Sequence, residues 1–147
     1  MGESEHQVPE FRLDVRVEGA DVDEQGHVSN IVYVRWIQDV AVAHSTALGY
    51  AHADYVGLGS FFVVRKHEVE YLRPAYAGEE VALLTHIARW RAASCERKTR
   101  IERVSDGALL CRATTLWAFI DIATGKPMRI PGEMKEGFGF AGVNARR

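Results

Sequence analysis

The chain has 147 residues, of which 47% are hydrophobic, 26% charged and 10% aromatic. This length suits one domain with a substantial core, and the composition is typical of a soluble globular protein. The formal net charge of −2 argues against binding to nucleic acid or to a membrane surface, because such partners usually require a basic excess. We therefore expect a single domain over residues 1–147, with flexible tails at residues 1–9 and 139–147.

The cysteines and the N-terminus indicate where the protein works. Cys95 and Cys111 form neither a CxxC motif nor a spacing typical of zinc sites, which favours a reduced, intracellular setting. Residues 1–10 are polar and acidic, so they lack the basic and then apolar pattern of an export signal. No apolar run approaches the roughly 20 residues that span a bilayer. We predict a cytoplasmic location.

The first two predicted elements are a strand and a long helix. Apolar and charged residues alternate over residues 11–18, and this period of two predicts a strand with one buried face. Over residues 30–48 the apolar positions recur at helical spacing, in a stripe so wide that we expect the helix to be enclosed in the interior. Ser29 or Asn30 can cap its first turn, and Gly49 follows where a left-handed residue often ends a helix.

The remaining elements are predicted strands. A loop rich in Gly and Ala, residues 50–60, precedes them, and residues 124–142, interrupted by Gly and Pro, are predicted to lie on the surface. The strands are predicted at residues 61–72, 80–90, 94–104 and 109–120. Ser-Asp-Gly at residues 105–107 is a hairpin signal, so the last two strands should be antiparallel neighbours. A curved antiparallel sheet is the only available partner for the helix, which predicts an α+β fold with the sheet wrapped around it.

A polar segment directly precedes the predicted helix. Residues 21–30 contain three carboxylates, a glycine, a histidine and an asparagine. The first N–H groups of a helix lack partners inside it, and the macrodipole adds partial positive charge there. The amides near Ser29 to Ile31 can therefore stabilise a developing oxyanion, while Asp23 acts as nucleophile or as general base on water. A carboxylate that only forms a turn is the alternative.

The order of these elements resembles the hot-dog fold of the 4-hydroxybenzoyl-CoA thioesterase family, over nearly the whole chain. Three segments carry the resemblance, at residues 21–33, 71–78 and 124–131. It implies hydrolysis of an acyl-CoA or acyl-carrier-protein thioester without a metal or a cofactor, since coenzyme A or phosphopantetheine enters as part of the substrate. It also implies a homodimer or homotetramer with the active site between subunits. The apolar start of the strand at residues 61–64 suits such pairing.

The resemblance also assigns roles to single residues. The catalytic carboxylate of the family is the second acid of a D-x-D pair, which is Asp23 here, whereas Asp21 matches the structural first acid. His27 lies where acyl-carrier thioesterases place a histidine that contributes to catalysis, although a histidine with only local hydrogen bonds is the more frequent case. Asn30 can orient the attacking water or cap the helix. Gly26 either lets the backbone approach the thioester or adopts a positive φ in a turn.

Basic residues concentrate between residues 89 and 103, and guanidinium groups pair well with the phosphates of coenzyme A or of a phosphopantetheinyl carrier. The members of this predicted patch are Arg89, Arg91, Arg97, Lys98, Arg100 and Arg103. We assign phosphate binding to Arg91, which joins Gly26, Ser29 and Ile31 as predicted substrate-binding residues. The alternative is a solvated strand face that is neutralised by intervening glutamates.

Other functions remain open. The benzoyl-CoA enzymes lack a histidine at the position of His27, and carrier-protein enzymes usually have Asn in place of Ser29, so the acyl group is undetermined. A hot-dog dehydratase or hydratase is a weaker alternative, because the segment before His27 lacks the proline of their motif. A non-catalytic acyl-CoA or acyl-carrier binding module is a third. Asp21, Asp23 and His27 have the ligand types of a metal site but an unspecific spacing.

Overall fold

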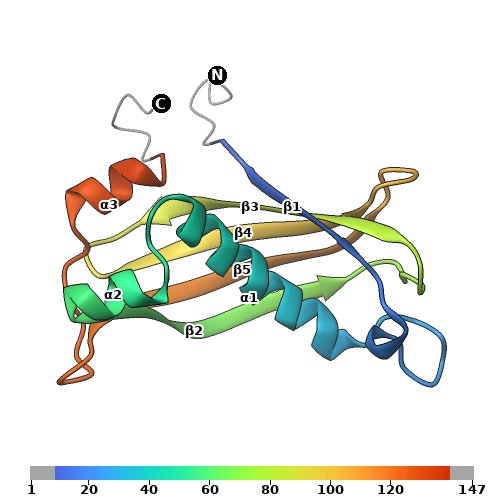
Figure 1. The fold of residues 1–147 in the computed structure, drawn as a ribbon, viewed down its shortest axis with the longest axis horizontal. Coiled ribbons are helices and arrows are strands. Elements are labelled where there is room, and N and C mark those ends of the chain that lie inside the picture. Colours follow the sequence, from blue (N-terminus) through green and yellow to red (C-terminus); the bar gives the residue numbers. More distant parts are fainter. Residues whose placement is uncertain (1–8, 140–147) are drawn as a thin grey trace.

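The strands of the sheet account for most of the regular structure. The structure, a computed structural model, describes residues 9–139. One antiparallel sheet in the order β1-β3-β4-β5-β2 contains all five strands of this part of the chain (Figure 1). They are β1 (Phe11–Arg16), β2 (Ser60–Tyr71), β3 (Glu80–Trp90), β4 (Ser94–Arg103) and β5 (Leu109–Asp121). The predicted strands and the antiparallel pairing of β4 with β5 are confirmed.

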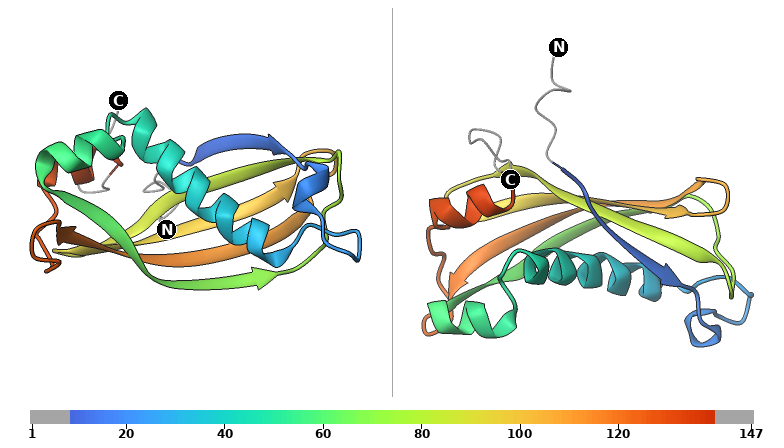
Figure 2. Two further views of the ribbon diagram at one scale, coloured as in Figure 1. Left: turned by 60° about the horizontal axis from the view of Figure 1, so that its bottom comes forward. Right: turned by 45° about the horizontal axis from the view of Figure 1, so that its top comes forward.

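The long helix α1 (Asn30–Ala47) lies across one face of the curved sheet (Figure 2). Ser29 caps it, and Gly49 follows its end at a φ of +95°. The face toward the sheet carries apolar residues such as Trp36, and burial of each large side chain stabilises the fold by roughly 1.5–3 kcal/mol. The helix is not enclosed all round, because a single sheet layer covers one side only. Ile31 is 79% exposed and Val42 59% exposed.

Two short helices differ from the sequence prediction. The segment predicted as a loop contains α2 (His52–Leu58), whose first turn is held by the Asp54 carboxylate accepting the Ala51 N–H at 2.8 Å. The segment predicted to lie on the surface contains α3 (Gly132–Gly137). Three residues spaced four apart in and around this helix are buried, namely Ile130, Met134 and Phe138. That helical spacing was the missed signal. No helix among the described residues is long and apolar enough to cross a membrane.

A row of polar residues divides the core into two apolar clusters. Inward-facing residues along a strand lie two apart, and on β3 they run Leu83, Thr85, Ile87. Leu83 belongs to the cluster beneath the N-terminal half of α1, and Ile87 to the cluster near α2 and α3. The buried polar residues of the sheet between them are Thr85, Arg97, Thr99 and Thr115.

His44 of α1 meets this polar row. The Arg97 guanidinium donates a hydrogen bond to His44 Nδ1 at 3.0 Å, so the ring proton lies on Nε2. The imidazole also stacks on Phe11 at 5.1 Å between centroids and meets the edge of Phe138 at 5.0 Å. Burial, together with the positive charge of Arg97, lowers the pKa of His44 from 6.5 to about 3. The folded protein therefore holds His44 neutral at physiological pH.

Replacing His44 should change the pH dependence of stability. Below pH 6.5 the unfolded chain takes up a proton at His44 that the folded chain does not, so the free energy of unfolding falls as pH drops from 6.5 toward 3. Between pH 7 and pH 5 this loss should be about 2 kcal/mol. His44→Asn keeps an acceptor for Arg97 but does not titrate, so it should lose about 2 kcal/mol less than the wild type over that interval. Urea unfolding at both pH values tests this, and an unchanged pH dependence would contradict it.

Candidate functional site

The loop between β1 and α1 forms the first candidate site. After a 3-10 turn at Gly19–Asp21, a bridge between Val22 and Val28 closes a short antiparallel loop at the N-terminal end of α1 (Figure 1). The Asp23 amide donates to the His27 carbonyl at 2.8 Å, and the Gly26 amide donates to the Asp23 carbonyl at 3.0 Å. Gly26 has a φ of +86°, which favours glycine. The backbone itself therefore fixes the loop that carries Asp23 and His27.

Asp21 anchors this loop to the helix. Its side chain is buried, with one oxygen accepting the Glu18 amide at 2.9 Å and the other accepting the Arg35 guanidinium at 3.1 Å. Its carbonyl oxygen accepts the Ser29 amide at 2.9 Å. These contacts join the 3-10 turn, the cap and the first turns of α1, in agreement with the structural role predicted for this acid.

The Asp23 side chain is exposed, and only one of its two carboxylate oxygens accepts a hydrogen bond from the described residues. Its Oδ1 accepts the Gln25 amide at 2.9 Å, which is the turn-forming role considered from the sequence. Its Oδ2 has no hydrogen-bond partner among residues 9–139. The turn therefore orients the carboxylate and leaves one oxygen available to another molecule.

The amides at the start of α1 differ in availability. The Ile31 amide donates to the Ser29 hydroxyl at 3.3 Å, and the Ser29 amide is used by Asp21. Within the described part of the chain the Asn30 amide has no acceptor, so it is the open donor where the helix dipole is positive. Because Ser29 caps the helix, the exposed side chain of Asn30 is not needed for that purpose.

His27 packs against residues 71–78, the second of the three segments that carry the family resemblance. Its ring meets the Tyr76 ring edge to face at 5.4 Å between centroids, and it has no hydrogen bond to any residue in 9–139. The neighbouring Val28 amide donates to the Ala75 carbonyl at 2.9 Å. Residues 72–78 therefore form one wall beside the loop. No three His, Cys, Asp or Glu side chains of the described residues are grouped as metal ligands, so Asp21, Asp23 and His27 do not form such a cluster.

Arg91 lies at the other end of the sheet. It follows β3, whose first residue Glu80 pairs with Arg16 beside the Asp23 loop. The 11 residues of β3 extend about 33 Å. Arg91 is 3.7 Å from a carboxylate oxygen of Glu96, as expected of a solvated strand face. Within one chain Arg91 therefore does not meet Asp23.

The predicted basic patch is not a single exposed surface. Alternation along β4 turns Arg97 inward, where it is 4% exposed. Arg103 is largely covered and pairs with Glu79 at 3.2 Å and Asp106 at 2.9 Å. Arg100 pairs with two glutamates, and only part of the set faces solvent. The prediction of an exposed patch was wrong for Arg97, because Cys95, Arg97, Thr99 and Ile101 share the buried face.

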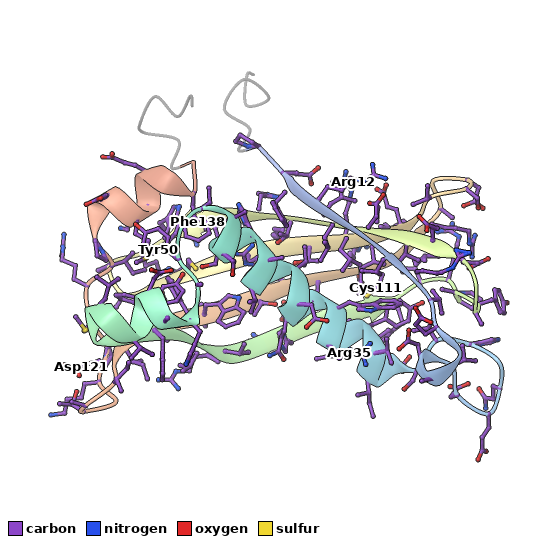
Figure 3. The ribbon with its side chains drawn as sticks, in the orientation of Figure 1. Arg12, Arg35, Tyr50, Cys111, Asp121 and Phe138 are labelled. Atoms are coloured by element: carbon purple, nitrogen blue, oxygen red, sulfur yellow. The ribbon has the colours of Figure 1, made fainter. Side chains whose placement is uncertain are left out.

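A cavity at the C-terminal end of α1 is a second candidate site that sequence reasoning did not define. It has a volume of about 340 Å³. Its lining includes Tyr50, from the segment predicted as a loop, and Phe61 and Phe62 at the start of β2. Figure 3 shows Tyr50 and Phe138 at this end of the molecule, with Arg35 near the other end of α1. The cavity wall begins at Ala41, about 17 Å along α1 from Asn30 at the start of the helix.

Residues 17–138 match the thioesterase-like superfamily. The chain belongs to this superfamily. Membership supports a thioesterase-type enzyme, while the narrower 4-hydroxybenzoyl-CoA thioesterase assignment stays a prediction. Among curated proteins, no match to the sequence was found.

Solved structures that are similar to this chain come from several bacteria. A Lactobacillus plantarum protein, assigned without proof as an oleoyl thioesterase, has a TM-score of 0.84 at 18% identity over 89% of this chain and 51% of its own. The present chain thus spans about half the length of that relative. The 1,4-dihydroxy-2-naphthoyl-CoA thioesterase Slr0204 from Synechocystis has a TM-score of 0.82 at 17% identity over 88% of this chain and 96% of its own.

A third structure, named a probable thioesterase from Bartonella henselae, has a TM-score of 0.77 at 26% identity, over 84% of this chain and 100% of its own. With the five-stranded antiparallel sheet, these likenesses confirm the predicted hot-dog fold.

The two loop aspartates should differ in their effect on stability. Asp21→Asn removes the charge from a buried group that accepts from Glu18 and Arg35, so it should lower the free energy of unfolding by about 1–3 kcal/mol. Asp23→Asn alters an exposed side chain and should change it by no more than about 0.5 kcal/mol. Urea denaturation of both variants makes the comparison. Equal losses would show that Asp21 does not anchor the loop.

Proposed function

We propose that the protein hydrolyses an acyl thioester of coenzyme A or of an acyl-carrier protein to a free acid and a thiol. One observation carries the proposal: the free carboxylate oxygen of Asp23 and the open amide of Asn30 belong to the same short stretch at the positive end of α1. Superfamily membership supports thioester chemistry. The Synechocystis neighbour, a CoA thioesterase by name, supports coenzyme A as the carrier.

The proposed reaction places the thioester carbonyl oxygen on the Asn30 N–H, where the helix dipole stabilises the negative charge that develops on it. Asp23 then attacks the carbonyl carbon and forms an acyl anhydride that water hydrolyses, or it removes a proton from the attacking water. In both routes the C–S bond breaks and the thiolate leaves and takes up a proton. The Asn30 side chain and His27 orient the water and the substrate, while Gly26, Ser29 and Ile31 shape the surface against which the thioester lies.

Asp23→Asn should lower kcat/KM by at least about 100-fold, because the amide neither attacks nor accepts a proton. Binding of acyl-CoA should persist, since the variant keeps the loop and the helix end. Thiol release from short, long and aromatic acyl-CoAs measures the effect. Glu24→Gln is the matched control, because Glu24 is an exposed neighbouring carboxylate without an assigned role.

The possible outcomes separate the proposals. Turnover that survives in Asp23→Asn would remove Asp23 from the mechanism. A wild type that binds acyl-CoA or an acyl-carrier protein but releases thiol from neither would instead favour the non-catalytic binding module.

The proposed active unit is a homodimer or homotetramer. Strand β2 is an edge of the sheet that pairs with β5 on one side only, and its start is apolar and half-buried. Such an edge favours association. Antiparallel pairing of two copies through β2 would invert one copy relative to the other. The Asp23 loop of one chain would then lie toward the end of its partner that carries Arg91, which is the arrangement that the proposed phosphate contact requires.

Light scattering coupled to size exclusion should give a mass two or four times the 16.4 kDa of one chain. Val63→Lys places a charge in the half-buried apolar start of β2 and should shift the protein toward smaller species. A wild-type mass of 16.4 kDa at assay concentrations would contradict the proposed assembly.

A further inference from the structure

A buried arginine without an acidic partner lies in the wall of the cavity at the C-terminal end of α1. Arg97 is 4% exposed, and none of the ion pairs among residues 9–139 includes it. Its Nη1 donates to His44 Nδ1 at 3.0 Å and to the Thr85 hydroxyl at 3.1 Å. Its Nε is buried without a partner, and its Nη2 has no hydrogen bond to a described residue. The unused Nε and Nη2 form the edge of a guanidinium that binds a carboxylate through two hydrogen bonds.

The surroundings of Arg97 do not neutralise its charge. His44 and Thr85 are uncharged partners, and the guanidinium lies 5.9 Å from the centroid of the Phe138 ring. Burial lowers the pKa of Arg97 to about 10, so the group stays protonated at neutral pH. A buried charge without a counter-ion is costly, and native proteins normally pair it. The charge of Arg97 is therefore available to an anion from outside the described residues.

The cavity selects what that anion is attached to. Its walls are mainly aromatic and aliphatic, and include Tyr55, Phe62 and Trp90. The Tyr55 hydroxyl is 2.6 Å from the Ser45 hydroxyl, which donates to the Tyr50 carbonyl, so the tyrosine has already used its proton. A second donor is unused: Trp117 also lines the cavity, and its buried Nε1 has no partner. A volume of about 340 Å³ suits a compact ligand.

We propose that this cavity binds an apolar, ring-sized molecule that carries a carboxylate, with the carboxylate on the guanidinium of Arg97. Trp117, on the strand next to Arg97, is the neighbouring donor. Thioester hydrolysis releases an apolar carboxylic acid, so the ligand class matches the proposed product. That link rests on the proposed function, whereas the binding itself does not.

Calorimetric titration with 2-naphthoate and with 2-naphthamide at pH 7 tests the proposal, because the two probes share a ring and differ in charge. The wild type should bind the acid at least tenfold more tightly than the amide. Arg97→Met should abolish this preference. Arg89→Met is the matched control, since Arg89 is an exposed arginine on the adjacent strand β3, and it should retain the preference. Equal binding of acid and amide by the wild type, or an acid preference that survives in Arg97→Met, would overturn the proposal.

A second variant covers the case in which Arg97→Met does not fold. Val42 lines the cavity but is 59% exposed, so Val42→Trp should fold and obstruct the opening. It should weaken 2-naphthoate binding at least fivefold, and unchanged binding would place the ligand elsewhere and overturn the proposal. The test is independent of turnover. Acid-selective binding without thiol release would remove the proposed function alone, while thiol release without acid preference would remove this inference alone.

Discussion

The packing of one face of α1 against the inner face of the sheet is the constraint on which both candidate sites depend. Trp36, Ile37 and Val40 fix the helix across the strands and so fix the positions of its two ends. At the first end the helix leaves an amide open and a dipole exposed next to the Asp23 loop. At the second end the helix, α2 and Phe138 after α3 leave a space above the sheet that their side chains do not fill. A shift of the helix along the sheet would disturb both sites together.

Features that are local in the sequence were predicted well. The period of two along the strands and the Ser-Asp-Gly turn gave the sheet, because these patterns depend on neighbouring residues. The Asp23 loop could also be recognised from the sequence, since Asp23, Ser29 and Asn30 lie within eight positions of one another. Which helix amides stay free could not be predicted, because this depends on the hydrogen bond that the Ser29 amide donates to the Asp21 carbonyl in the folded loop.

Features assembled from distant segments were missed or misplaced. Arg97 was assigned to an exposed patch because arginine is rarely buried, although its alternation with Ile101 on β4 marks the inner face. Arg91 lies far from Asp23 within one chain, which the sequence does not report, so its predicted phosphate contact depends on the proposed assembly of two chains. The cavity needs side chains from α1, α2, β2, β3, β4, β5 and the segment after α3, so no single stretch of sequence predicts it.

The polar row across the middle of the core has a cost that the fold alone does not explain. An apolar residue in place of Arg97 would join the two apolar clusters, and such replacements of buried charges are often neutral or stabilising. Burial, together with the Arg97 charge, instead holds the His44 imidazole neutral, and Nε and Nη2 of the guanidinium have no acceptors among the described residues. An anionic ligand that supplies those acceptors would bind the folded chain only, and it would stabilise the fold in proportion to its occupancy. Local departures from the most stable arrangement are expected where a protein binds something, and the buried, unpaired charge of Arg97 is such a departure.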